Sequence, residues 1–102
     1  MNYRNFTPHT INLNDGRKFE SEGIARVSSE FTEVLEDLCF VEFGEVTGLP
    51  DPQPKTRIIV SALVMQVASD RKDLVAPATG HPETIRNEKG HIVSVPGFIA
   101  QK

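Results

Sequence analysis

The sequence has little of several features that would assign a protein to a class at once. Its 102 residues include one cysteine and no tryptophan. Cys39 alone cannot form an internal disulfide, and no pair of cysteines has the spacing of a zinc site. We therefore expect neither a disulfide-rich secreted domain nor a structural zinc module. The unpaired thiol favours a reducing, cytoplasmic location.

Long apolar runs are also missing. The longest apolar stretch, residues 58–67, is interrupted by Ser61 and Gln66. It falls far short of the ~20 residues that span a bilayer. Residues 1–10 are polar and contain Pro8, unlike the apolar segment of a secretory signal. These features predict a soluble cytoplasmic protein without a membrane partner.

The chain has no excess of basic residues. Eleven Lys and Arg stand against 14 Asp and Glu, for a net charge of −3. This balance argues against direct binding to nucleic acid or to an anionic membrane. The charge is nevertheless unevenly spread: +2 over residues 1–19, −8 over residues 20–54 and +3 over residues 55–102. One interpretation is that the acidic segment, residues 20–54, is a solvated face. The other is that the basic ends line a pocket for an anionic ligand, while the acidic segment faces away or meets a partner.

What is present predicts one small folded domain over residues 1–102. Apolar residues make up 38% of the chain and charged residues 25%, enough to form a core. Asn14-Asp15-Gly16 is a strong hairpin-turn signal between the alternating residues 10–13 and 17–21. Residues 24–28 alternate again, so the first thirty residues are expected to form an antiparallel meander.

The middle of the chain leaves two interpretations open. Residues 32–38 could form a short helix or an acidic excursion between strands. Residues 40–43 are typical of a strand, and Gly44 and Gly48 indicate a bulge or a close backbone approach. Three prolines within residues 49–54 exclude regular structure there.

A strand that runs into a capped helix is the clearest predicted element. Residues 57–60 form an apolar, β-branched run typical of a strand buried on both faces. Ser61 is a preferred N-cap for a helix over residues 62–68. Residues 74–77 are expected to be extended. Residues 84–95 predict a second hairpin with Gly90 at the turn position that requires positive φ.

Together these elements predict an α+β fold. We expect a small, mainly antiparallel sheet with hairpins at both ends and one main helix after a buried central strand. Several strand edges would remain exposed in so short a chain. Self-association into a homo-oligomer would cover them.

The candidate ligand-binding residues lie in three places. Asn5, Thr7 and His9 are held beside Pro8 on a stiff polar segment, although they could simply satisfy backbone groups. Ser61 stands where free helix N–H groups could bind an anion, with plain helix capping as the alternative. Arg71 could clamp a phosphate or carboxylate, or could pair with Asp73 in a structural ion pair.

Catalytic and cofactor signals are missing. His9, His81 and His91 lie too far apart in the sequence for a metal pair. No glycine-rich phosphate loop and no nucleophile elbow is present, so we expect no metal and no cofactor. Cys39 lies in an apolar run and is expected to be a buried, inert thiol.

Several segments resemble a family of small, mostly uncharacterised proteins from bacteria and bacteriophages. The segments that carry the resemblance are Asn5-Phe6-Thr7-Pro8-His9, Phe43-Gly44-Glu45-Val46-Thr47-Gly48-Leu49-Pro50, Ile59-Val60-Ser61-Ala62-Leu63-Val64, Arg71 with Asp73, Leu74 and Pro77, and Gly90-His91-Ile92-Val93 with Gly97-Phe98. The resemblance implies a microbial or viral protein, acting in the host cytoplasm if a phage encodes it, and brings no reaction with it.

By analogy with small phage proteins, we favour a non-catalytic binding function. The first hypothesis is that the protein binds or sequesters a small anionic or nucleotide-like ligand, such as a host-defence signal. The alternative is a protein-interaction module or inhibitor of a host protein that uses the acidic segment. A small hydrolase that depends on His9 is the least favoured of the three.

Overall fold

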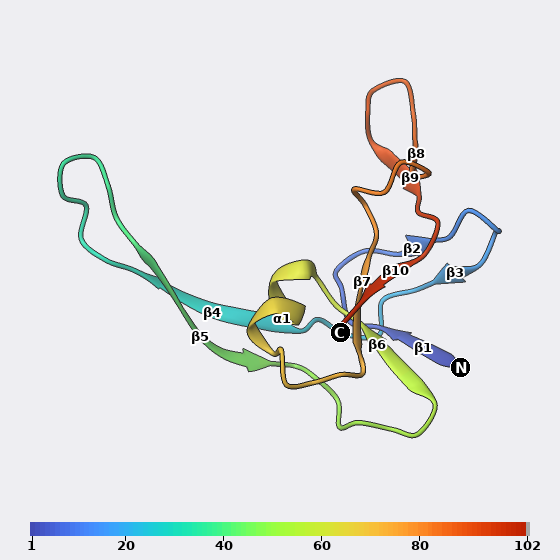
Figure 1. Ribbon diagram of the computed structural model, residues 1–102, viewed down its shortest axis with the longest axis horizontal. Coiled ribbons are helices and arrows are strands. Elements are labelled where there is room, and N and C mark those ends of the chain that lie inside the picture. The colour runs from blue at the N-terminus through green and yellow to red at the C-terminus, as the bar shows by residue number, and fades with distance from the viewer. Residues whose placement is uncertain (102) are drawn as a thin grey trace.

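The protein is mainly β with one short helix (Figure 1). The computed structural model describes residues 1–101. The elements, in chain order, are β1 (Asn2–Asn5), β2 (Ile11–Asn12), β3 (Lys18–Phe19), β4 (Arg26–Phe31), β5 (Val41–Thr47), β6 (Thr56–Ile59), α1 (Ala62–Val67), β7 (Leu74–Pro77), β8 (Ile85–Arg86), β9 (Ile92–Ser94) and β10 (Phe98–Ala100). Among the described residues there is no helical segment with the length and hydropathy of a membrane span.

The main sheet has the strand order β1-β6-β7-β10 and is largely parallel. β1 runs parallel to β6, β6 runs parallel to β7, and only β10 is antiparallel to its neighbour. The prediction of a mainly antiparallel sheet is therefore wrong for the main sheet, while the predicted helix and hairpins are confirmed. The physical reason is the crossover through α1. A helix between β6 and β7 brings the chain back to its starting end, so the second strand repeats the direction of the first.

The core lies between this sheet and the helix. Ile58, Val60 and Leu74 are buried completely and form one cluster with Val64 and Ala68 of the helical segment. Ile59 of β6 points to the opposite face and is also fully buried. The predicted strand with two buried faces is thereby confirmed.

Aromatic side chains join the first hairpin to the main sheet. Phe19 of β3 lies 5.6 Å, between ring centroids, from Tyr3 of β1. Phe98 of β10 lies 5.0 Å from Tyr3 and 6.0 Å from Phe19. Such ring pairs add to the stability that burial alone supplies.

The two predicted hairpin turns are confirmed. β2 and β3 pair around Gly16, and β8 and β9 pair around Gly90, and both glycines have positive φ. The predicted meander over the first thirty residues is wrong. Its first two strands pair as β2 and β3, but β4 pairs with β5 and not with β3.

β4 and β5 form a long hairpin that projects from the rest of the protein (Figure 1). We call residues 26–47 the arm. Residues 32–38 form its tip, an excursion without a helix, in which Glu36 and Asp37 have positive φ. Cys39 is exposed beside the tip, so its expected burial is wrong. The apolar residues around it have no second layer to pack against.

The prediction of a bulge or a close backbone approach concerns the two glycines of this region. The β4–β5 register shifts between Val27 and Ser29. Gly44 packs against the side chain of Ser28, where a β-carbon would meet the hydroxyl. Gly48 has φ of +87° and lies against the carbonyl of Ile24. The predicted close backbone approach is therefore found at Gly48, whereas Gly44 lies at the register shift and contacts a side chain that can turn aside.

Candidate functional site

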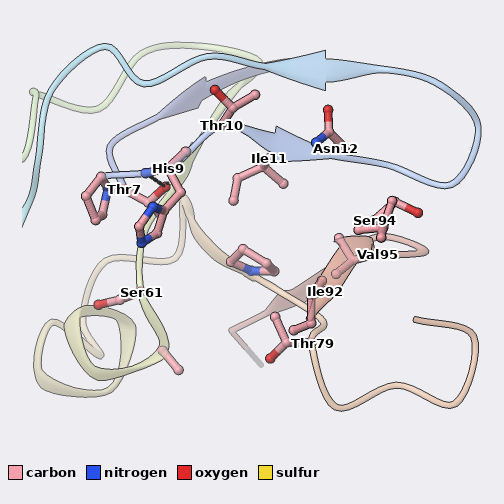
Figure 2. A pocket seen from close by; sticks show the side chains of 14 residues that line it. Thr7, His9, Thr10, Ile11, Asn12, Ser61, Thr79, Ile92, Ser94 and Val95 are labelled. Atoms are coloured by element: carbon pink, nitrogen blue, oxygen red, sulfur yellow. Dashed lines mark hydrogen bonds between the residues drawn. The ribbon is translucent and has the colours of Figure 1, made fainter. Parts of the chain in front are cut away.

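A cavity of about 440 Å³ opens between the segment after β1, the start of α1 and strand β9 (Figure 2). Four stretches of chain form its walls. The lining residues are Thr7, Pro8, His9, Thr10, Ile11, Asn12, Ser61, Ala62, Pro77, Thr79, Ile92, Val93, Ser94 and Val95. Its volume lies in the range of small-molecule sites, roughly 300–1,000 Å³.

The wall that carries Thr7 and His9 is held in place by Asn5. The Asn5 side chain is 1% exposed. Its Nδ2 donates to the carbonyls of His9 (2.7 Å) and Phe19 (2.9 Å). Its Oδ1 accepts from the backbone N–H (2.9 Å) and the hydroxyl (2.7 Å) of Thr7. Asn5 is therefore a positioning residue beneath the cavity, and its hydrogen-bonding capacity is used within the protein.

Thr7 belongs to the same network. It is buried, and its hydroxyl lies 3.0 Å from the His9 carbonyl and 3.4 Å from the His9 backbone nitrogen. Thr7 therefore fixes the turn at Pro8 more than it offers a free group to a ligand. The consequence is that the His9 backbone has one defined position at the cavity rim.

The side chain of His9 is the polar group that this turn presents. It is exposed and makes no hydrogen bond within residues 1–101. Figure 2 shows its ring extending toward the start of α1, where Ser61 lies. The Ser61 hydroxyl accepts from the N–H of Val64 at 3.3 Å, as expected of an N-cap, and keeps its own proton for a further acceptor.

The rest of the cavity lining is mostly apolar. Ile11 and Ile92 face each other across the cavity, and Thr79 adds a hydroxyl near its lower rim (Figure 2). The side chains of Thr10 and Asn12 point away from the cavity in the same view. The surface offered to a ligand is thus an apolar slot with the His9 ring and the hydroxyls of Ser61 and Thr79 at its edge.

Arg71 and Asp73 lie outside this cavity. The Arg71 guanidinium bonds to both carboxylate oxygens of Asp73, with Nε–Oδ1 and Nη2–Oδ2 distances of 2.8 Å. It also donates to the carbonyl of Pro50 at 3.0 Å. This geometry is that of the structural ion pair, and it ties the proline-rich connector to the end of the helical segment. The bonds from Arg71 lower the pKa of Asp73, while Asp73 raises the pKa of Arg71.

The structure therefore brings three of the six predicted binding residues to one cavity. Thr7, His9 and Ser61 line it, Asn5 supports it from below, and Arg71 with Asp73 stands elsewhere. Sequence reasoning missed Ile11 and the β9 wall, because a strand residue's exposure to a cavity depends on what packs opposite it. Thr79 was within reach of a sequence signal, because it follows the extended segment that ends at Pro77.

The cavity lining does not contain the basic side chains that the positively charged ends of the sequence predicted. Among its lining residues, His9 alone has an ionisable side chain. No group of three metal-ligating side chains occurs within residues 1–101. Comparison of the chain with protein-family models, with curated proteins and with solved structures finds no significant match to any of them.

Proposed function

We propose that this protein is a non-catalytic binding protein that holds a small, nucleotide-like ligand in the cavity beside His9. The observation that carries this proposal is the convergence of residues 7–12, 61–62, 77–79 and 92–95 on one space of about 440 Å³. Residues 5–9 and 59–64 are also segments that carry the resemblance to phage and bacterial proteins. By analogy with other small phage proteins, we propose that this ligand is a host-defence signal that the protein sequesters.

The lining chemistry narrows the ligand class. Apolar walls at Ile11 and Ile92 suit a flat ring system, while His9, Ser61 and Thr79 suit ring substituents, sugar hydroxyls or a phosphate oxygen. With no Lys or Arg in the lining, a ligand of low charge, such as a nucleoside monophosphate or a cyclic nucleotide, fits better than a polyphosphate.

Isothermal titration calorimetry of the 102-residue chain tests the proposal. The probes are nucleosides, nucleoside monophosphates, nucleoside triphosphates and cyclic nucleotides at up to millimolar concentration. We expect one of these ligand classes to bind. The His9→Ala substitution should raise the dissociation constant of that ligand at least ~10-fold, which corresponds to ~1.4 kcal/mol. His91→Ala is the matched control, since His91 is exposed and lies outside the cavity lining.

A second variant separates anionic from neutral ligands. Ser61→Asp keeps a side chain that can cap the helix and adds a carboxylate to the cavity wall. It should abolish binding of a phosphate-bearing ligand and leave a neutral nucleoside nearly unaffected. The proposal fails if no probe binds, or if His9→Ala and His91→Ala behave alike. Recovery of the bound ligand chemically altered would instead support a hydrolase.

A second candidate function uses the acidic segment as a protein-interaction surface. The observation in its favour is the arm, where Phe31, Leu38 and Phe40 are 70–77% exposed next to acidic residues. Exposed apolar groups with a polar rim are typical of protein contact sites. Charge reversal of Glu33, Glu36 and Asp37 should abolish capture of a protein partner by the immobilised chain and leave cavity binding unchanged.

A further inference from the structure

The arm carries more exposed apolar surface than an isolated hairpin tolerates. Val27 and Val46 at its base pack against the core, but its other large apolar side chains are 41–77% exposed, namely Phe31, Val34, Leu35, Leu38, Phe40, Val41 and Phe43. β4 and β5 pair only with each other, so the outer edge of each strand is unpaired within residues 1–101. A two-stranded hairpin without a covering layer is marginally stable in water. The arm therefore has the composition of a surface that another chain covers.

The area of the whole molecule leads to the same conclusion. Its accessible surface is 7245 Å². A compact monomer of 11.3 kDa exposes about 5,700 Å². The excess of roughly 1,500 Å² exceeds the ~800 Å² that each partner contributes to a standard protein interface. The radius of gyration is 15.5 Å, against about 13 Å for a compact chain of this length. The excess surface area therefore accompanies an extended shape.

Charge indicates what covers the arm. Residues 26–47 contain six acidic residues and one basic residue, and the rest of the chain contains eight acidic and ten basic residues. The arm therefore has a net charge of −5 and the rest of the chain +2. Two arms repel each other, whereas an arm and the body of a second copy attract.

The body offers a matching surface on the β8–β9 hairpin. Ile85, Ile92 and Val93 are 49%, 42% and 49% exposed there. Arg86 and Lys89 lie in the same hairpin with one acidic residue, Glu88, and within residues 1–101 the guanidinium of Arg86 bonds to the backbone carbonyls of Gly90 and Thr79. Three apolar side chains on a hairpin of net charge +1 complement an apolar tip with an acidic rim.

We propose that the protein self-associates by packing the arm of one copy on the β8–β9 hairpin of another, an inference that rests on the second candidate function above. Figure 1 shows the two hairpins extending from different sides of the main sheet, so the arm of a chain does not cover the β8–β9 hairpin of the same chain. A reciprocal exchange of two arms closes a two-fold dimer. Since Ile92 and Val93 also line the cavity, the partner's arm then borders the ligand site.

Sedimentation equilibrium of the 102-residue chain, from micromolar to sub-millimolar concentration, tests the proposal. We expect a reversible dimer in the wild type. The double variant Leu38→Ser, Phe40→Ser and the single variant Ile85→Ser should each weaken the dimer at least ~10-fold. Leu63→Ser, a change of equal chemistry at a 40% exposed position of α1, is the matched control and should not weaken it.

A charge exchange adds a positive result that general destabilisation cannot mimic. Glu33→Lys on the arm and Lys89→Glu on the body should each weaken self-association, and an equimolar mixture of the two variants should recover part of it. Circular dichroism of each variant verifies that the fold is retained.

The outcomes separate the two proposals. A monomer at every concentration, or a dimer that the arm variants leave intact, overturns the self-association. If the chain is monomeric while its arm captures a different protein, the second copy is excluded and the interaction function of the arm stands. If the arm variants change neither property, both proposals fall. Ligand binding in the cavity is measured separately by calorimetry.

Discussion

Asn5 positions one wall of the cavity through its buried side-chain amide. Four hydrogen bonds from one buried amide hold the turn through Pro8 and attach it to β3. If the amide is removed, all four of these hydrogen bonds are lost, although the Thr7 hydroxyl and the His9 carbonyl still lie 3.0 Å apart. A buried polar group without a partner costs more than a hydrogen bond contributes.

Asn5→Ala should therefore lower the free energy of unfolding by about 2–4 kcal/mol, measured by urea titration. It should also weaken ligand binding, because His9 loses its defined position. Asn2→Ala, at the exposed start of β1, is the control and should change the free energy of unfolding by less than about 0.5 kcal/mol. Equal effects of the two variants would contradict the positioning role of Asn5.

The ion pair of Arg71 and Asp73 makes stability depend on pH. Hydrogen bonds from Arg71 hold the pKa of Asp73 below its ordinary value of 3.8. A lowered pKa in the folded state means that the carboxylate form stabilises the fold. This contribution is complete above pH 3.8 and is lost as the pH falls through the folded-state pKa.

Asp73→Asn should lower the free energy of unfolding by about 1–2 kcal/mol near neutral pH, since both side chains are only 17–22% exposed. The difference between the wild type and the variant should shrink as the pH falls below 3.8. Thermal unfolding at a series of pH values measures this difference. The exposed Asp70→Asn variant should show neither effect, and a constant difference at all pH values would exclude the ion pair as its cause.

At the scale of elements, the base of the arm depends on backbone conformation as well as on the packing of Val27 and Val46 against the core. Gly48 ends β5 with a positive φ, at a place where the chain passes against the carbonyl of Ile24. Any side chain here has to adopt an unfavourable conformation and also displace that carbonyl. The close approach of the two chain segments at the base of the arm therefore requires glycine at this position.

Gly48→Ala should cost about 2 kcal/mol or more, and Gly16→Ala about 1 kcal/mol. Gly16 also has a positive φ, but a β-carbon there would meet no atom within 4 Å. The comparison thus separates conformational strain from the steric clash. Denaturant midpoints measure both values, and equal costs would indicate that the carbonyl moves aside freely.

At the scale of the whole molecule, the separation of charge between arm and body governs association. If self-association depends on attraction between the −5 arm and the +2 body, it should weaken several-fold when NaCl rises from about 0.05 to 0.5 M, because the Debye length shortens. Sedimentation equilibrium at both salt concentrations measures this. A stronger dimer at high salt would indicate apolar contact without electrostatic attraction.

The sequence by itself determined the local features of this protein. The turns at Gly16 and Gly90, the cap at Ser61 and the irregular connector of residues 49–54 were all predictable. Each of these signals resides in a few neighbouring residues, because a turn or a cap is made by the backbone groups next to it. The convergence of Thr7 and His9 with Ser61 was a hypothesis that these local features alone could not test.

Only the tertiary structure decided which strands pair and which surfaces remain open. The pairing of β1 with β6 joins residues more than fifty positions apart. The sequence of Asn2–Asn5 has no apolar alternation that would predict a strand. The exposure of Cys39 and the β9 wall of the cavity likewise depend on what lies opposite in space. Backbone groups of a strand can bond a neighbour in either direction, so the parallel sheet, the cavity and the projecting arm follow from long-range packing rather than from local sequence.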